Sequence, residues 1–367
     1  MTTVTLSVTT ISRPVLGNGG GGGGAIPPSN TVAPVLSGTP TVGQTLSCST
    51  GTWLGTLPIT YTYQWRRGVS NISGATSSTY TLVQADASFA VTCIVTATNA
   101  AGSADSTSNS LTIVDADAQA FITAAGITDN TQKSAINTLV LSLKSNSIWT
   151  KMKAIYPMVG GTATTHKFNL KNPLDTNAAF RLVFNGGWTH SSTGALPNGT
   201  NGYANSFLST SAISLNSVHV SYYSRTNNTS TGCEIGGGNS SPDTYTLLQG
   251  RTHVAPTTDT AIWINNTATV DRVAGVNTAA FFCGSRTAAN IIRLFRNSVR
   301  IINGTASSNV TSTFPIWLGA FNFAGSGAVW SNRECAFASI GDGLTDTDAA
   351  NFYTAVQNFQ VALSRNV

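Results

Sequence analysis

Residues with the potential for acid–base chemistry are few in this chain of 367 residues. Asp and Glu together number 14, and only two of these are glutamates, Glu234 and Glu334. Glycoside hydrolysis needs two carboxyl groups that face each other across a cleft, and these two could converge. Each lies next to a cysteine, which indicates a partly buried position, so an ion pair such as Glu334 with Arg333 or Arg225 explains them as well. We therefore predict no catalytic residues and no enzyme.

Other catalytic and metal-binding patterns are also weak. No Gly-x-Ser-x-Gly sequence precedes any of the four histidines, so a serine nucleophile of that kind is not indicated. A calcium site would use Asp and backbone carbonyl oxygens, and the candidates are Asp175, Asp342, Asp346 and Asp348. The last two are explained by helix capping. We predict no metal and no cofactor.

One group of residues has the composition of a carbohydrate-binding site. Sugar recognition needs an exposed aromatic ring for the apolar face of the sugar, and planar polar side chains for its hydroxyl groups. Three loop segments supply these types, namely Trp188, His190, Asn198, Asn201, Tyr203 and Trp330, with Asn332 beside the last. The alternative is that Trp188 and Tyr203 are packing residues and that Gly186 and Gly187 form a bulge.

The composition favours short strands with many turns. Only 9% of residues are charged and 41% are hydrophobic, against about 25% charged in an average soluble protein. The net charge of +5 is thinly spread, with no basic run longer than Arg66-Arg67, so we predict no nucleic-acid partner. No apolar run approaches the length of a membrane span, and the N-terminus lacks the pattern of a signal peptide, so we expect no membrane insertion.

Residues 1–29 are predicted to form an N-terminal arm and linker. Val4, Leu6 and Val8 alternate as in a strand, and Gly19 to Gly24 are consecutive glycines. The segment is either a flexible linker or an anchoring arm that adds a strand to the sheet edge of another protein or of a sister copy. We favour the anchoring arm.

Residues 30–114 are predicted to form a β-sandwich. Cys48, Trp65 and Cys93 have the order and spacing of an immunoglobulin sandwich, in which the tryptophan packs on the cysteine pair. The segment resembles the Ig-like repeats of phage and bacterial surface proteins. That resemblance implies a core cysteine pair, as a disulfide or as two thiols. Val91 stands where these domains usually carry a tyrosine.

Residues 115–158 change to a helical pattern and are predicted to form a short connector. A helix over 118–125 ends at Gly126, and Asp129 caps a second one with Ile136, Leu139 and Leu143 along one face. A helix with a single apolar stripe must bury it, so we expect the connector to pack on a neighbouring domain or on sister copies.

Residues 159–367 are predicted to form a second, larger β-sandwich that ends in a helix. A hairpin spans 291–302, a short strand spans 314–318, and a last strand, 336–340, leads into a helix capped by Thr345 with Asp348 at its third position. This order resembles the end of a laminin-G-like (concanavalin-type) jelly-roll sandwich, with Ser298 in place of a usual Gly. The predicted fold class is therefore all-β.

The region from about residue 158 onward also resembles the C-terminal module of structural proteins of tailed bacteriophages, on the segments 185–190, 195–203 and 221–225. The resemblance implies a virion protein assembled in the host cytoplasm: a head or tail fibre, spike or decoration subunit. Such a subunit would attach to capsid or tail proteins through its arm, form a homo-oligomer such as a trimer, and bind host surface glycan. Two alternatives stay open, a polysaccharide depolymerase with a concanavalin-like fold and a purely architectural cement protein.

Overall fold

The computed structural model describes residues 24–252, 259–266 and 271–367. The chain divides into two compact units. Unit 1 comprises Met1–Ser37, Leu46–Tyr80 and Val91–Leu111, and unit 2 comprises Gly38–Thr45, Thr81–Ala90 and Thr112–Val367. The predicted arm residues Val4, Leu6 and Val8 lie outside the described residues.

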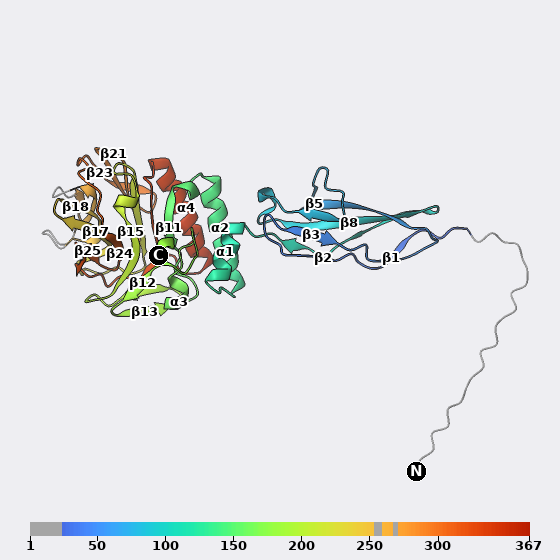
Figure 1. Cartoon of the computed structure of the whole chain (residues 1–367), viewed down its shortest axis with the longest axis horizontal. Helices are drawn as coiled ribbons and strands as arrows, with labels where there is room; N and C mark the ends of the chain where they lie inside the picture. Colours follow the sequence, from blue (N-terminus) through green and yellow to red (C-terminus); the bar gives the residue numbers. More distant parts are fainter. Residues whose placement is uncertain (1–23, 253–258, 267–270) are drawn as a thin grey trace, which may run out of the picture. The chain divides into compact units, whose positions relative to one another are not determined.

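Unit 1 is a small β-sandwich (Figure 1). One sheet has the order β10-β8-β5-β6, with β9 also pairing with β8, a second has the order β2-β3-β7, and β1 pairs with β4. The strands are β1 Ser29–Val32, β2 Leu36–Ser37, β3 Thr45–Cys48, β4 Thr52–Leu54, β5 Thr60–Arg67, β6 Ser70–Asn71, β7 Thr79–Thr81, β8 Ala90–Asn99, β9 Gly102–Thr107 and β10 Leu111–Thr112.

The residues that predicted an Ig-like sandwich lie in the core of unit 1. Alternate residues of β8 are buried, because successive side chains of a strand point to opposite faces. Trp65 lies opposite Cys93 in the β5–β8 ladder and is fully buried beside Tyr80. Cys48 and Cys93 are both buried thiols, and the hydrogen bond between them, together with burial, raises the pKa of Cys93.

Unit 2 contains two large sheets. The first, the eight-stranded sheet, has the order β13-β14-β27-β16-β21-β22-β23, with β11 pairing with β27. The second, the nine-stranded sheet, has the order β12-β15-β24-β17-β18-β19-β20 and carries the hairpin β25–β26 beside β17. The strands are β11 Met152–Tyr156, β12 Val183–Asn185, β13 Trp188–Ser191, β14 Gly194–Pro197, β15 Tyr203–Ser209, β16 Val218–Ser224, β17 Gly232–Ser240, β18 Asp243–Arg251, β19 Thr260–Asn266, β20 Asp271–Val273, β21 Ala280–Ala288, β22 Ile291–Arg296, β23 Val299–Gly304, β24 Pro315–Leu318, β25 Phe321–Phe323, β26 Ser326–Ala328 and β27 Cys335–Gly341.

The two sheets of unit 2 share a buried apolar core. Val220 and Tyr222 of the eight-stranded sheet and Ile262 and Ile316 of the nine-stranded sheet belong to this one cluster. Together with unit 1, this arrangement confirms the predicted all-β class, with two β-sandwiches and a C-terminal helix.

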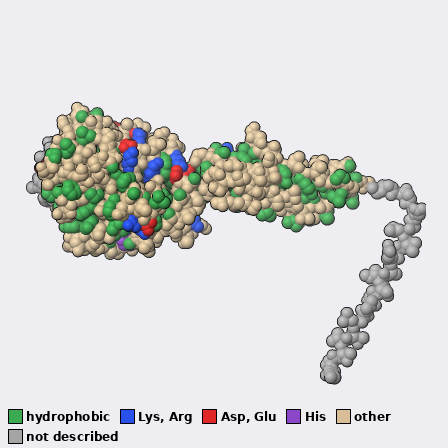
Figure 2. Space-filling model, in the orientation of Figure 1, with side chains coloured by type: hydrophobic (Ala, Val, Ile, Leu, Met, Phe, Trp, Pro, Cys, Tyr) green, Lys and Arg blue, Asp and Glu red, His purple; other side chains and the backbone are tan. Residues whose placement is uncertain are grey.

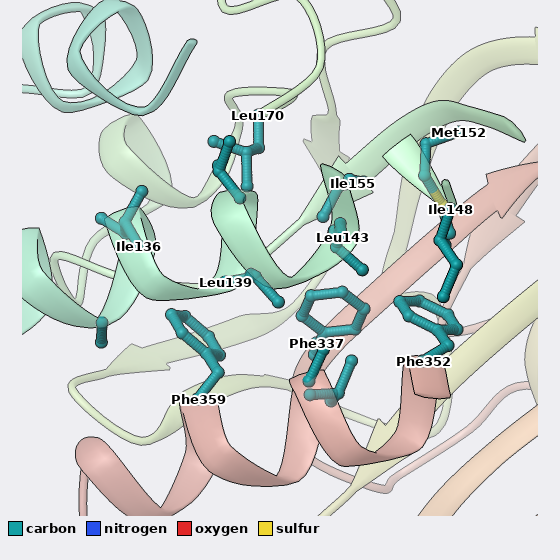
Figure 3. Close-up of a cluster of buried hydrophobic side chains, with 14 of the residues drawn as sticks. Ile136, Leu139, Leu143, Ile148, Met152, Ile155, Leu170, Phe337, Phe352 and Phe359 are labelled. Carbon is teal, nitrogen blue, oxygen red and sulfur yellow. The ribbon is translucent and has the colours of Figure 1, made fainter. Parts of the chain in front are cut away.

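A layer of helices covers the other face of the eight-stranded sheet (Figure 1). The layer consists of α1 Ala116–Ala124, α2 Asn130–Ser145 and α4 Asp346–Ala362, and the short α3 Ala163–His166 lies elsewhere in unit 2. Figure 3 shows Leu139 and Leu143 of α2 facing Phe352 and Phe359 of α4, with Phe337 of β27 between the two helices. The predicted connector helices are therefore part of the larger unit's core.

Local sequence signals set the helix ends. The Asp129 carboxylate accepts a hydrogen bond from the Gln132 backbone at 2.8 Å and begins α2. Thr345 and Asp348 form the predicted capping box of α4.

Two segments differ from the expected pattern. Residues 152–156, placed in the helical connector, form β11 in the eight-stranded sheet, because they hydrogen-bond along β27. The strand expected over 180–184 is β12, Val183–Asn185, because Asn177–Ala179 forms a 3-10 turn and Phe180 adopts a left-handed conformation with φ +59°.

Candidate carbohydrate-binding surface

An aromatic group lies on the outer face of the nine-stranded sheet. In β24, Ile316 and Leu318 enter the core between the sheets, so Trp317 points to the opposite face. The Tyr203 ring from β15 stacks on Trp317, with 3.8 Å between ring centroids and 18° between planes. The ring centroid of Trp330 lies 6.3 Å from that of Tyr203. We call these three residues the aromatic platform.

The backbone around Trp330 holds this ring in place. Its indole lies against Gly327 of β26, where an added Cβ would stand 2.1 Å from a ring carbon. The flanking residues are fixed by two backbone hydrogen bonds, from Cys233 N to Val329 O at 2.9 Å and from Ser331 N to Gly319 O at 2.8 Å. Glycine at position 327 is therefore needed for the ring to lie this close to the hairpin.

Polar side chains border the platform. The Asn332 amide oxygen accepts a hydrogen bond from Asn228 Nδ2 at 2.9 Å, and Asn332 Nδ2 donates to Ser230 Oγ at 3.3 Å. Gly199 lies against Asn332, since an added Cβ there would stand 3.1 Å from the Asn332 Cβ. Three loops thus meet beside Tyr203 and Trp330, which both keep part of their surface accessible.

The predicted ligands Asn198 and Asn201 stabilise their own loop. The Asn198 side-chain oxygen accepts hydrogen bonds from the backbone N–H groups of Thr200, Asn201 and Gly202, each at 3.0 Å. The Asn201 oxygen accepts from Gly187 N at 3.0 Å and from Asn198 Nδ2 at 2.7 Å. Their amide oxygens therefore shape the loop that carries Tyr203.

Trp188 and His190 form a separate cluster with Phe184. Phe184 makes edge contacts with both rings, at 5.1 Å to Trp188 and 4.6 Å to His190. Trp188 packs against the core between the sheets, and its buried indole N–H has no hydrogen-bond partner. It also lies beneath Gly319, at the edge of the aromatic platform. The structure thus places Trp188 as a packing residue.

A second histidine completes this cluster. The Nδ1 atoms of His166 and His190 are 2.9 Å apart, so one nitrogen donates and the other accepts. Burial, His190 and the charge of Arg365 lower the pKa of His166 to about 3. His166 is therefore neutral at physiological pH.

Each of the two glutamates forms an ion pair with a different arginine. Glu234 is buried, accepts a hydrogen bond from Arg333 Nη1 at 2.7 Å and also accepts from Gly250 N. Glu334 accepts from Arg225 Nη1 at 2.8 Å and from Thr193 Oγ1 at 2.6 Å. Burial raises the pKa of Glu234, against the opposing effect of Arg333.

The aspartates considered for calcium have cationic partners. Asp175 accepts from both Lys167 and Arg181, Asp346 from Arg300, and Asp348 from Lys151. Among the described residues, no group of three or more His, Cys, Asp or Glu side chains is placed to hold a metal ion. No helix in the described ranges is both long and apolar enough to cross a bilayer.

Sequence reasoning missed Trp317, the residue on which Tyr203 stacks. The alternation in Pro315–Leu318 was the available signal, because it places Trp317 on the face opposite Ile316 and Leu318. That Tyr203 would meet it depended on the register of β15 against β24, in which Asn205 lies opposite Trp317.

No family model matches the chain, and no curated protein is a detectable relative. Several solved structures are similar. They include the CBM40 of a Ruminococcus gnavus IT-sialidase (14% identity, TM-score 0.29, covering 36% of this chain and 79% of that one). Domain 4 of AbnA, a GH43 extracellular arabinanase from Geobacillus stearothermophilus in complex with arabinotriose, matches with 14% identity, a TM-score of 0.33, and coverage of 55% and 98%. A mutant of Trypanosoma rangeli sialidase matches with 8% identity, a TM-score of 0.40, and coverage of 87% and 49%. A similarity this low transfers no function to this chain.

Proposed function

We propose that unit 2 binds carbohydrate, without cleaving it, through the aromatic platform. The observation that carries the proposal is the Tyr203 ring stacked at 3.8 Å on Trp317 with Trp330 beside it. Two partly exposed rings fixed by packing offer an apolar surface to the C–H face of a sugar without a large loss of side-chain entropy. The amides of Asn332 and Asn228 beside them bond each other, and each keeps a further donor or acceptor position that suits sugar hydroxyl groups.

The test is a glycan array followed by calorimetry on the sugars that bind. Trp330→Ala and Tyr203→Ala should each weaken binding by about tenfold or more, which corresponds to about 1.4 kcal/mol. Phe323→Ala is the matched control, because Phe323 is 37% exposed on the neighbouring hairpin and outside the platform. If no array glycan binds the wild-type protein, or if the control weakens binding equally, the proposal fails.

Trp188→Ala is a poor test of binding. Trp188 packs against the core, so its removal should destabilise unit 2 and reduce binding through unfolding. Weaker binding of Trp188→Ala would therefore report a loss of stability and not a lost contact with the ligand.

A polysaccharide depolymerase is the enzymatic alternative to this proposal. The arginine partners of Glu234 and Glu334 favour structural roles for both carboxylates. Cleavage of host polysaccharide by the wild-type protein, lost in both Glu234→Gln and Glu334→Gln, would support the depolymerase and displace the binding proposal.

The biological setting that we propose is a tailed-bacteriophage particle, on the sequence resemblance alone. In it the protein is a fibre, spike or decoration subunit, assembled in the host cytoplasm and attached through its N-terminal arm, with homo-oligomers presenting several platforms to host glycan. Electron microscopy of particles that lack this protein should show an appendage missing. Particles that lose an appendage but keep wild-type adsorption would instead indicate an architectural cement protein.

A further inference from the structure

A long part of the sequence around the start of unit 1 carries no charge. Arg13 and Arg66 bracket a stretch without Lys, Arg, Asp, Glu or His. Surfaces formed by this stretch can offer only apolar contacts and neutral hydrogen bonds. Any partner that covers them is therefore selected by shape and apolar area rather than by charge.

Within that stretch, large aliphatic side chains are exposed along two paired segments. We call this surface the apolar ribbon, and its side chains are Ile26 (65% exposed), Val32 (56%), Val35 (53%), Leu54 (64%) and Leu57 (79%). The segments are joined by hydrogen bonds, from Thr56 N to Ile26 O at 3.0 Å and from Ser49 N to Val35 O at 3.0 Å. Ser29 lies opposite Leu54 in the β1–β4 ladder.

Figure 2 shows hydrophobic side chains gathered over the end of unit 1 where the described chain begins. Hydrophobic residues exposed singly need no explanation, but several gathered at one end of a folded domain make that end a candidate interaction site. The described residues leave this surface accessible.

We propose that the apolar ribbon binds the chain's own N-terminal segment around Val4, Leu6 and Val8. These three residues alternate, so in an extended chain they share one apolar face. The ribbon begins at Ile26, and residues 9–25, rich in glycine, join the two. Glycine-rich coils of about this many residues span on average about 20–25 Å, close to the length of a strand of six to eight residues, about 20–27 Å.

The short connection favours the chain's own segment over that of a second copy. Joining two binding partners through a short stretch of chain gives an effective concentration on the order of millimolar, far above ordinary protein concentrations. The inference does not depend on carbohydrate binding. It does add to the proposed anchoring arm, because an arm held on its own unit would have to leave the ribbon before it could bind another protein.

The test is hydrogen exchange of backbone amides in the full-length protein, followed by mass spectrometry. Amides of residues 3–9 should exchange about tenfold or more slowly than in an unstructured peptide of the same sequence, independently of protein concentration. The double variant Leu54→Ser, Leu57→Ser should remove this protection. Both side chains are exposed, so unit 1 should stay folded, which the protection of β8 amides verifies.

Val69→Ser is the matched control, because Val69 is 86% exposed elsewhere on unit 1, and it should leave the segment protected. Exchange of residues 3–9 at the unstructured rate in the wild type would overturn the inference. Protection that rises with protein concentration would overturn the assignment to the chain's own segment in favour of a second copy. Protection that persists in the double variant would show that the ribbon is not the binding surface.

Discussion

The carboxylate of Glu234 accepts a hydrogen bond from Nη1 of Arg333 at 2.7 Å, and both side chains are fully buried. A buried ion pair adds little net stability relative to an apolar pair, but the loss of one partner leaves an uncompensated charge. We expect Glu234→Leu and Arg333→Met each to lower the free energy of unfolding by about 3–5 kcal/mol. The double variant should lose much less than the sum. Urea unfolding followed by tryptophan fluorescence measures all three, and additive losses would contradict a coupled pair.

The position of Trp330 depends on a glycine that can be changed without altering the ring itself. Gly327→Ala places a Cβ 2.1 Å from the present position of a Trp330 ring carbon, so the indole must move. We expect glycan affinity to fall about tenfold while unit 2 stays folded. Ser326→Ala, an exposed change on the same strand, serves as control. Unchanged affinity in Gly327→Ala would show that the orientation of Trp330 does not matter for binding.

Substitutions at buried positions of the helical layer should lower stability as substitutions in a hydrophobic core do. Phe352 of α4 is fully buried against Phe281 and Phe337 of the eight-stranded sheet. Phe352→Ala should cost about 3–5 kcal/mol, measured by chemical denaturation of the full chain. Val361→Ala on the same helix, at 53% exposure, should change stability by no more than about 0.5 kcal/mol. Equal effects would mean that α4 is held by its own helix-forming tendency and not by packing.

Acid should destabilise unit 2 through His166. Burial, His190 and Arg365 lower the pKa of His166 to about 3, while an unfolded chain would take up the proton near pH 6.5. Stability is therefore fully present above about pH 6.5 and is lost as the pH falls toward 3, at up to about 1.4 kcal/mol per pH unit. Burial lowers the pKa of His219 to about 4 and adds a loss of the same sign. Urea midpoints at several pH values should fall less steeply in His166→Leu than in the wild type, and parallel slopes would contradict the assignment.

Signals that act over a few residues could be predicted from the sequence. The capping box of Thr345 and Asp348 and the order of Cys48, Trp65 and Cys93 depend only on local hydrogen bonding or on strand alternation. The two-sheet architecture followed from the same patterns, because strands that bury one face must stack against another sheet.

Contacts set by long-range register could not be predicted. Nothing in the sequence around Tyr203 indicates that it would stack on Trp317, or that Glu234 rather than Glu334 would pair with Arg333. The side chains of Asn198 and Asn201 have the chemistry of sugar ligands, but their amide oxygens accept hydrogen bonds from nearby backbone N–H groups. Residue type alone cannot distinguish these uses.

The pairing of α2 with α4 has a consequence for biosynthesis. Helix α2 ends at Ser145, whereas α4 begins at Asp346, yet their apolar faces meet over the same sheet. On the ribosome, α2 emerges long before α4 has been synthesised, so the apolar face of α2 stays exposed on the nascent chain until then. Loop-closure entropy makes such distant contacts slow to form. Truncated products or stalled synthesis should therefore yield aggregation-prone intermediates that depend on chaperones.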